Sequence, residues 1–510
     1  MTPDVAVHAD RHMQPDPQDI LAPAELRAQG SVRVVVQSEL AGTYASQHTA
    51  WTLVNMLARQ FGLVVHIEVD APEAALLPGV AAFGQANTLG MALCECIRLI
   101  GEPHVTVRES TDEAIDIELV IGASPRSQTC GKRWYLHAEG WRWYVGEAPC
   151  SSGNLPSSNP VALGPHLAAC FAAGEVFKQL RGLKERRGKF IESFFGSAWS
   201  GDTAASWDEL EDGPPLEALV LPHIYVVGGG AVAQACLFAL GASGLQGSLT
   251  VIDDDTLDIS NNNRYVLSMA SDHEDVKVRI AERYLERTKI VCIPVEAKWD
   301  AFVREPKIEW SRSDLLANER ARRYPIVLSD VDKNRPRHEI QNVLPRLIVG
   351  GSTDGMTARA QIVDWSSETA CLKCFNPLED TVAIAHAKIE EARQGDDTMR
   401  ATICRDLGIS VEELKRVMGA TGCGELMPAD VERFGAGPRQ MSVGFVSVAA
   451  GVLQATQLLR SLLLDGNCLG NGELVAVAFG TGRIKTIHVA RDHDCDCGEE
   501  RHHRWRRWWS

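Results

Sequence analysis

A glycine-rich turn offers the first candidate chemistry in this chain. Gly228, Gly229 and Gly230 follow the apolar run 224–227 and precede a helical pattern. Glycine lets the backbone approach a phosphate closely, and a helix N-terminus presents unpaired N–H groups and the positive end of a dipole. The segment therefore predicts a nucleotide-binding turn. The G-x-G-x-x-A pattern that ends at Ala233 suits either NAD or ATP.

Polar residues downstream of the turn narrow this choice. An acid after the second strand of such a fold commonly holds a ribose, and a lone lysine or aspartate has an ordinary structural explanation. Together these residues suit a triphosphate better, because cations neutralise its charge and a carboxylate binds Mg²⁺. A hydride-transfer enzyme needs no such set. Its members are Asp253, Asp255, Asn261, Arg264, Lys277, Asp332 and Arg337.

The order and spacing of this set resemble the ThiF/MoeB and ubiquitin-activating (E1-like) superfamily over residues 221–498. The family pattern has a glycine loop, an aspartate pair, S-N-x-x-R, a lysine on the next helix, and an aspartate with a downstream arginine. Two positions depart from it, because Tyr265 and Lys333 stand where the family usually has Gln and Asn.

The resemblance implies a role for each member of the set. Gly228 and Gly230 would line the ATP site, Asp253 would hold the ribose, and Asp255 would lie near the phosphates. Asn261, Arg264 and Lys277 would bind phosphate oxygens, and Asp332 would bind Mg²⁺. Arg264 and Asp332 would thereby act in catalysis.

Two cysteine pairs suggest a structural zinc site. Cys371 and Cys374 form a C-x-x-C, and Cys495 and Cys497 form a C-x-C near the end of the chain. Four thiolates make a closed tetrahedral site for zinc. The family usually has C-x-x-C in the second pair, and His493 is an alternative ligand. Redox use of the first pair competes, but no helix is expected to start at that pair.

A thioester-forming enzyme also needs an exposed cysteine on mobile backbone. In the family this residue lies between the first zinc pair and the long helix, where this chain has Cys404 and Cys423. Cys404 falls beside an apolar helical stripe. Cys423 lies between two glycines, which suit a nucleophile that must move toward an acyl-adenylate. We therefore favour Cys423, with Cys404 and an inert role for both as alternatives.

Composition limits the class of protein. A chain of 510 residues is too long for one hydrophobic core, so we expect two or more domains. Its 51 basic and 67 acidic side chains give a net charge of −16. This acidic balance argues against a nucleic-acid partner. The N-terminus shows no signal peptide, and polar residues interrupt the apolar stretch 444–464, so we expect a buried helix and no membrane partner. The 14 cysteines are then reduced thiols or ligands in a cytoplasmic protein.

We expect an α/β protein in which a Rossmann-like adenylation domain follows a degenerate copy of itself. Both halves run from a buried strand to a long amphipathic helix, but the first has QSELAGTYAS where the glycine turn should be. The expected parts are an arm (1–30), the degenerate domain (31–185), a linker (186–220), the ATP-binding domain (221–498) with a helical catalytic-cysteine insert (378–434), and a tail (499–510).

By this resemblance the chain would be a compact bacterial ubiquitin-activating enzyme of the anti-phage conjugation type. It would adenylate a small β-grasp protein with ATP and Mg²⁺, take the acyl group as a thioester, pass it to a conjugating enzyme, and form a homodimer. The alternatives are a sulfur-carrier adenylyltransferase without the thioester, an NAD-dependent oxidoreductase, and a non-catalytic scaffold. We also leave open whether the first half supplies an arginine to the ATP site, and we expect the Arg/Trp-rich tail to be frayed.

Overall fold

A computed structural model describes most of the chain, which forms two compact units, Met1–Phe375 with Met441–Ser510, and Asn376–Gln440. The described residues are 29–109, 114–126, 130–151, 159–183, 188–304, 324–364, 370–376, 381–407, 409–419, 428–435, 441–464, 473–493, 495 and 497–509. Most of the expected N-terminal arm lies outside them.

The first half of the larger unit is an eight-stranded sheet of order β3-β2-β1-β4-β5-β6-β7-β8. Its strands are β1 (Gly30–Val36), β2 (Val64–Asp70), β3 (Thr106–Glu109), β4 (Ile115–Ile121), β5 (Cys130–Glu139), β6 (Arg142–Gly146), β7 (Ser193–Ser197) and β8 (Thr203–Ala204). Its helices are α2 (Tyr44–Ala58), α3 (Leu89–Gly101) and α4 (Leu163–Arg181).

The second half repeats this order as β11-β10-β9-β12-β13-β14-β15-β16. Its strands are β9 (Ile224–Val227), β10 (Gln246–Ile252), β11 (Lys289–Val295), β12 (Ile326–Ser329), β13 (Leu347–Asp354), β14 (Thr357–Asp364), β15 (Glu473–Ala478) and β16 (Arg483–His488). Its main helices are α5 (Ala231–Ala242), α6 (Lys277–Leu285), α7 (Trp299–Arg304), α9 (Asn334–Asn342), α10 (Leu372–Phe375), α15 (Gly444–Leu463) and α16 (Glu499–Trp509).

The two sheets share more than their strand order. In each, the first five strands of that order are parallel to their neighbours, and the last three are antiparallel. The central parallel strands β9 and β12 are short, fully buried and almost entirely apolar, as expected of strands covered on both faces. The predicted duplication, and with it the α/β fold class, is confirmed.

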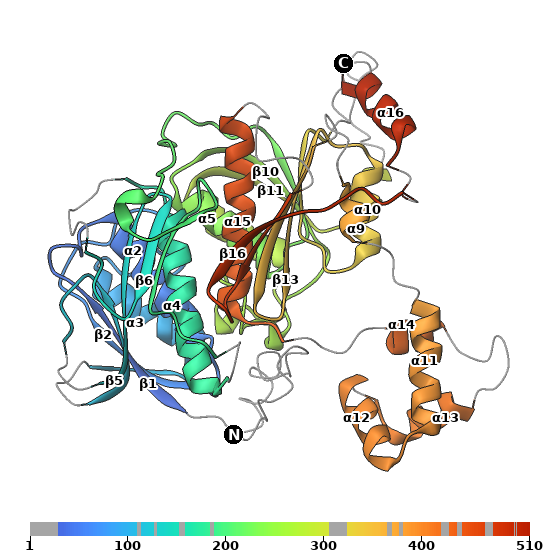
Figure 1. The fold of residues 1–510 in the computed structure, drawn as a ribbon, viewed down its shortest axis with the longest axis horizontal. Helices are drawn as coiled ribbons and strands as arrows, with labels where there is room; N and C mark the ends of the chain where they lie inside the picture. The colour runs from blue at the N-terminus through green and yellow to red at the C-terminus, as the bar shows by residue number, and fades with distance from the viewer. Residues whose placement is uncertain are drawn as a thin grey trace. The chain divides into compact units, whose positions relative to one another are not determined.

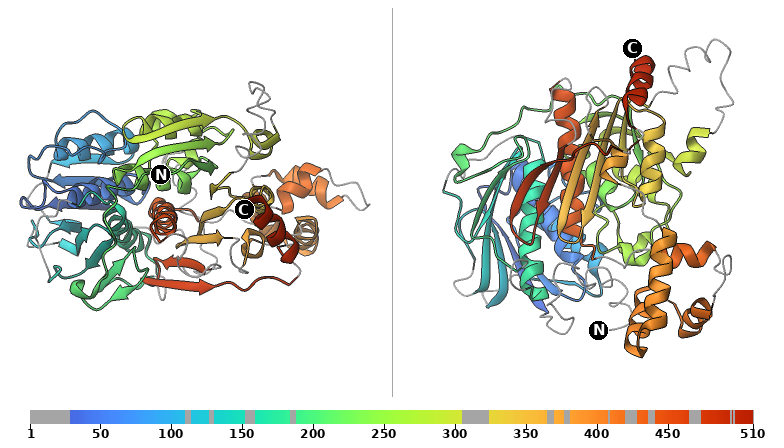
Figure 2. Two further views of the ribbon diagram at one scale, coloured as in Figure 1. Left: turned by 90° about the horizontal axis from the view of Figure 1, so that it is seen from above. Right: turned by 45° about the vertical axis from the view of Figure 1, so that its right-hand side comes forward.

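Helices from both halves join the sheets into one body. α15 packs on α5 and on α4, and α4 packs on α2 (Figure 1). Seen from above, α4 and α15 lie between the strands of the two halves (Figure 2). The largest hydrophobic cluster of the described residues contains side chains from both halves. α15 is long and apolar enough to cross a membrane by length and composition alone, but 89% of its apolar stretch is buried in this core.

The segment 186–220, expected to be a linker, is instead part of the first sheet. It contains β7 and β8, and its aromatic side chains bind it to the preceding strands. The rings of Phe195 and Tyr144 lie 4.5 Å apart, as do those of Trp207 and His137. The Gly, Ser and Pro content suggested a flexible chain, but these aromatic anchors outweigh it.

The C-terminal segment, expected to be frayed, is the helix α16. The indole of Trp505 donates a hydrogen bond to the Pro345 carbonyl at 3.0 Å, and that of Trp509 donates to Leu344 at 2.8 Å. The guanidinium of Arg501 donates to Asn342 at 3.1 Å. The two tryptophans are one helical turn apart, so one face of α16 packs on the segment that joins α9 to β13.

The smaller unit is helical, as predicted for the insert. It contains α11 (Thr381–Gln394), α12 (Asp397–Leu407), α13 (Val411–Gly419) and α14 (Pro428–Gly435) around its own apolar cluster. A capping box opens α13, because Ser410 Oγ accepts a hydrogen bond from the Glu413 N–H while Glu413 accepts one from the Ser410 N–H.

Two fully buried histidines, His48 and His166, lie where the helices of the two halves meet. His166 on α4 stacks on Phe238 of α5 at 4.6 Å, and its ring lies 5.6 Å from that of His48 on α2. Burial lowers the pKa of His48 to about 3 and that of His166 well below its usual value. Neither ring has a hydrogen-bond partner among the described residues.

We predict that stability falls as the pH drops below about 6.5. The unfolded chain binds protons on these histidines there and the folded chain does not, so each contributes up to about 1.4 kcal/mol per pH unit. Urea unfolding from pH 7.5 to 5 should show a shallower loss for His166→Phe than for the wild type. His503→Phe, on the exposed side of α16, should leave the slope unchanged; an unchanged slope in His166→Phe would contradict the assignment.

Candidate functional site

The glycine turn and two of the aspartates meet at the carboxyl ends of three adjacent strands. Ile252 of β10 pairs with Val227 of β9, which also pairs with Ser329 of β12. The residues that follow these strands therefore lie side by side. Strand order changes direction between β9 and β12, and ligands of open α/β sheets bind at such a switch point.

The glycine turn needs glycine for conformation and for space. Gly228 has a φ of 100°, and a Cβ there would lie 2.7 Å from the Asp330 carbonyl oxygen. Gly230 is the N-cap of α5 and supplies no side-chain cap. The first N–H groups of α5 thus lie at the switch point, where they suit an anionic ligand.

Asp253 fixes the shape of the turn. Its carboxylate accepts hydrogen bonds from the Gly229 N–H at 2.5 Å and from the Asp255 N–H at 2.8 Å. Burial raises the pKa of Asp253, while these N–H groups and Lys277 oppose the rise. The carboxylate is therefore held at the mouth of the turn, the position that a ribose-binding acid takes in this fold class.

Lys277 brings a cation to the same turn. Its ammonium lies 2.9 Å from the Asp255 carboxylate, and its Cβ would be 3.0 Å from a Cβ on Gly229. Burial disfavours the charge of Lys277, but Tyr265 and the two aspartates together raise its pKa. The lysine is thus held as an ammonium beside the backbone N–H groups of the turn.

The segment 260–268 carries the other predicted phosphate ligands. Asn261 is buried, and the Arg264 guanidinium donates to the Ser260 carbonyl at 2.9 Å and to Asn263 at 2.8 Å. The same guanidinium lies 5.6 Å from the ring centre of Tyr265. Arg264 is therefore near the turn but is held against its own segment in this structure.

Asp332 and Arg337 flank the loop after β12. Asp332 is exposed, and Arg337 donates a hydrogen bond to the Val331 carbonyl at 3.0 Å. Burial lowers the pKa of Arg337, while Asp330 and Asp332 oppose that change. The exposed carboxylate of Asp332, near the half-buried Arg337, is a suitable ligand for Mg²⁺, which binds oxygen atoms.

Three residues of this region were not predicted as site residues from the sequence. Tyr265 was noted only as a departure from the family pattern. The carboxylate of Asp330 is buried, and burial raises its pKa well above the usual range, while Gln454 and Arg337 oppose the rise. Arg59 comes from the first half. No spacing could have indicated this residue, since 203 positions separate it from Asn262, its partner.

Arg59 connects the first half to the segment 260–268 of the second half. Its buried guanidinium donates to the Asn262 carbonyl at 2.6 Å, to the Asn262 side chain at 2.8 Å and to the Ser268 carbonyl at 2.6 Å. Asn55 adds a bond to the Val266 carbonyl at 3.1 Å. Burial lowers the pKa of Arg59 to about 9. This arginine thus holds the backbone of the segment that carries Asn261 and Arg264.

The equivalent crevice of the first half is filled by its own side chains. Gln37 follows β1, as Gly228 follows β9, and its amide oxygen accepts a hydrogen bond from the Ala123 N–H at 2.7 Å. Asp70, at the end of β2, pairs with Arg126 at 3.1 Å. In the degenerate half, side chains therefore bridge the loops that follow these strands, at the place where the second half has its glycine turn.

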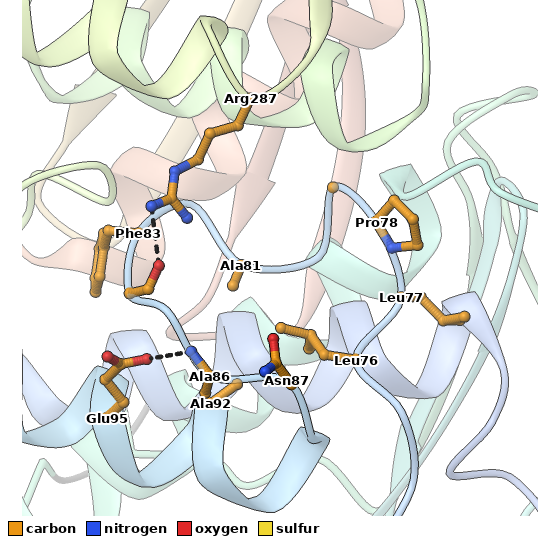
Figure 3. Close-up of a pocket in the computed structure, with 12 residues that line it drawn as sticks. Leu76, Leu77, Pro78, Ala81, Phe83, Ala86, Asn87, Ala92, Glu95 and Arg287 are labelled. Atoms are coloured by element: carbon orange, nitrogen blue, oxygen red, sulfur yellow. Dashed lines mark hydrogen bonds between the residues drawn. The ribbon is translucent and has the colours of Figure 1, made fainter.

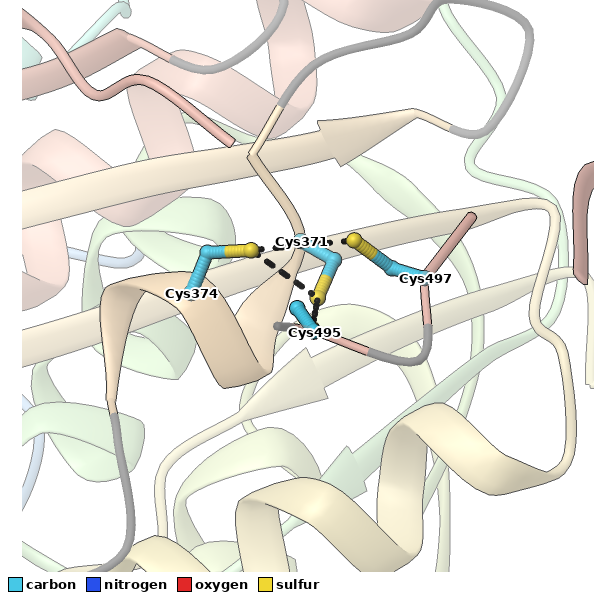
Figure 4. Close-up of side chains that lie close together, drawn as sticks. All are labelled: Cys371, Cys374, Cys495 and Cys497. Atoms are coloured by element: carbon cyan, nitrogen blue, oxygen red, sulfur yellow. Dashed lines mark hydrogen bonds between the residues drawn. The ribbon is translucent and has the colours of Figure 1, made fainter. Parts of the chain in front are cut away.

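The four predicted zinc ligands come together in the larger unit (Figure 4). The sulfur of Cys371 lies 3.6 Å from that of Cys374 and 3.5 Å from that of Cys495, and Cys374 lies 3.7 Å from Cys497. A tetrahedral zinc with Zn–S bonds of about 2.3 Å needs sulfur atoms about 3.8 Å apart. The cluster fits that ion, and the C-x-C spacing does not prevent the arrangement.

The two cysteines considered as nucleophiles differ in what the structure describes. Cys404 is buried on α12, and its thiol contacts the Ser410 carbonyl at 3.8 Å. Burial, Glu412 and Glu413 raise its pKa, which disfavours the reactive thiolate. Cys423 lies outside the described residues.

A cavity of about 260 Å³ lies away from this site, between the segment 76–87 of the first half and Arg287 of the second (Figure 3). Arg287 donates to the Gly84 carbonyl at 2.9 Å, and Glu95 accepts from the Ala86 N–H at 3.0 Å. None of the predicted site residues lines it.

Comparisons with known families agree with this geometry. The ThiF family profile matches residues 205–498, more than half of the chain, and the BilD N-terminal domain profile matches residues 31–189. The two profiles cover the second and first halves in turn.

Three curated relatives are similar to this chain over different shares of its length. An uncharacterized protein of Sinorhizobium fredii, y4jF, is 24% identical over 77% of this chain and 69% of its own length. The bacterial E1-like protein BilD of Collimonas is 26% identical over 56% of this chain and 59% of its own length. The catalytic subunit of the NEDD8-activating enzyme of Caenorhabditis elegans is 29% identical over 31% of this chain and 37% of its own length.

We predict that Arg59→Met loosens the segment 260–268. The change leaves several buried carbonyl groups without donors, which should cost about 3 kcal/mol of stability. Hydrogen exchange should accelerate at residues 260–268 beyond the change seen across β1. Arg98→Met, which removes a half-exposed arginine from α3, is the control and should leave both regions unchanged. Equal protection of 260–268 in Arg59→Met and wild type would contradict this role.

Proposed function

This chain belongs to the ThiF family, and from that premise we propose that it activates the C-terminal carboxylate of a small ubiquitin-like protein with ATP. The observation that carries the proposal is the hydrogen-bonded cluster of Gly229, Asp253, Asp255 and Lys277 at the switch point of the second sheet. It combines an anion-binding turn, a ribose-binding acid and a cation, which together suit a nucleotide with several phosphates.

The proposed reaction begins with an attack on the α-phosphate. A carboxylate oxygen of the protein substrate forms a bond to the α-phosphorus, and the bond to the bridging oxygen of the β-phosphate breaks. Pyrophosphate leaves with the electron pair, and an acyl-adenylate remains. Lys277, Arg264, Asn261 and the N–H groups of α5 would hold the phosphates in line. Bound Mg²⁺, held by Asp332, would neutralise charge on the departing oxygens.

We further propose that a cysteine of the helical unit accepts the acyl group. Its thiolate would attack the acyl carbon, form a thioester and release AMP, after which a conjugating enzyme would take the acyl group. Cys423 is the favoured residue, supported by its two glycine neighbours and by the burial and raised pKa of Cys404.

The sulfur-carrier adenylyltransferase is the second candidate function, because that reaction would use the same adenylation site and no thioester. The presence of a helical unit with its own core between α10 and α15 favours modifier activation, since adenylation alone gives that unit no role. The family favours ATP over NAD. We also propose a cytoplasmic homodimer with a β-grasp substrate, acting in phage defence as the bacterial resemblance implies.

Zinc is proposed as a structural ion at Cys371, Cys374, Cys495 and Cys497. It would join α10 to the segment between β16 and α16 within the larger unit. Structural zinc stabilises the fold that supplies its ligands.

Asp332→Ala should abolish ATP–pyrophosphate exchange that depends on the protein substrate, because the exposed carboxylate proposed to hold Mg²⁺ is lost. Asp300→Ala, on the surface of α7 where the acid pairs with Arg304, should retain exchange. Exchange at the wild-type rate in Asp332→Ala would overturn the Mg²⁺ assignment.

Cys423→Ala should retain pyrophosphate exchange and lose the reductant-sensitive adduct with the protein substrate on a non-reducing gel. Cys404→Ala should retain both. The opposite result, in which only Cys404→Ala loses the adduct, would make Cys404 the nucleophile.

Metal analysis of the purified protein should find about one zinc ion per chain. Cys371→Ser should lower the zinc content and the melting temperature, whereas Cys292→Ser, outside the cluster on β11, should keep the zinc. A zinc-free wild-type protein with unchanged stability in chelator would remove the site.

A further inference from the structure

Tyr265 occupies an unusual place beside the glycine turn. Its side chain is 5% exposed, and its hydroxyl oxygen lies 3.8 Å from the position that a Cβ on Gly230 would take. Gly230 is the N-cap of α5, so the hydroxyl is next to the N–H groups proposed to hold phosphate.

The Tyr265 hydroxyl has no hydrogen-bond partner among the described residues, whereas the hydroxyls of two other buried tyrosines, Tyr284 and Tyr144, each have one. Tyr284 donates to the Phe238 carbonyl at 3.0 Å, and Tyr144 donates to the Ala148 carbonyl at 2.6 Å. Buried tyrosines usually find such a partner. A hydroxyl left without one at a ligand site is available for the ligand.

The charges around Tyr265 suit a donor to an anion. Lys277 and Arg264 are close enough to act on its phenol, and burial outweighs them to raise the pKa of Tyr265. The phenol therefore keeps its proton at neutral pH. A neutral hydroxyl beside two cations can donate to a phosphate oxygen without adding negative charge.

The backbone of Tyr265 is also fixed in place. Its carbonyl accepts hydrogen bonds from the Ser268 N–H at 3.1 Å and from the Ser268 hydroxyl at 2.9 Å, and the Ser268 carbonyl is bound by Arg59. A donor whose position is set by such contacts needs little rearrangement when its ligand binds.

We infer that the Tyr265 hydroxyl donates a hydrogen bond to a phosphate oxygen of the bound nucleotide at the N-terminus of α5. This rests on the proposed function, since it assigns one further contact in the same site. The residue takes no proton and transfers none; it supplies one hydrogen bond that the turn and Lys277 do not.

Calorimetric titration of Tyr265→Phe with Mg·ATP and with adenosine tests this contact. The change removes one oxygen and keeps the ring. We expect ATP affinity to fall about tenfold, as for a hydrogen bond to a charged group, and adenosine affinity to stay the same because adenosine has no phosphate. Unchanged ATP affinity, or an equal loss for both ligands, would overturn the inference.

Tyr284→Phe is the matched control. It also removes a buried phenolic oxygen, and should lower the melting temperature without changing ATP affinity. If it weakens ATP as much as Tyr265→Phe does, the effect comes from the fold and the inference fails. A wild-type protein that does not bind Mg·ATP would instead refute the proposed function, so the two failures are distinguishable.

Discussion

The buried guanidinium of Arg59 is the contact on which the candidate site depends. It comes from the degenerate half and binds the backbone of 262–268 in the other half through four carbonyl or amide oxygens. A buried charge without a directly bonded carboxylate is costly unless every donor is used, so this arrangement strongly favours one position of the segment. The positions of Asn261, Arg264 and Tyr265 depend on this contact of Arg59. The first half therefore serves the site although its own crevice is closed.

The two halves share one architecture but differ in the turn that follows the first strand of each. The second copy has glycine after its first strand, which opens the switch point and leaves the N–H groups of α5 available. The first copy has Gln37 there, and its side chain crosses to the loop after β4. Both copies keep the long buried helix, because α4 and α15 build the common core. Packing has kept the two copies alike, whereas the chemistry is confined to one.

Local signals in the sequence predicted the parts whose geometry is local. The glycine turn, the aspartates after β10 and the cysteine spacings indicated the right elements, and apolar periodicity indicated both long helices. The segments 186–220 and 499–510 were predicted wrongly, because the sequence does not show the tertiary partners of the aromatic residues that anchor them, among them Trp207, Trp505 and Trp509. The role of Arg59 could not be found, since its partners in the second half are more than 200 positions away. Tertiary contacts fix the positions of these residues, and the spacing of residues along the chain does not reveal such contacts.

The central claim is that the open turn of the second half supports attack on the α-phosphate of ATP. The most direct measurement is the fate of the phosphates when the protein is incubated with Mg·ATP and its small β-grasp partner. The account predicts pyrophosphate in amounts equal to the activated partner, with the label of α-labelled ATP on the partner or in AMP. Release of ADP and inorganic phosphate, with no α-label on the partner, would contradict it.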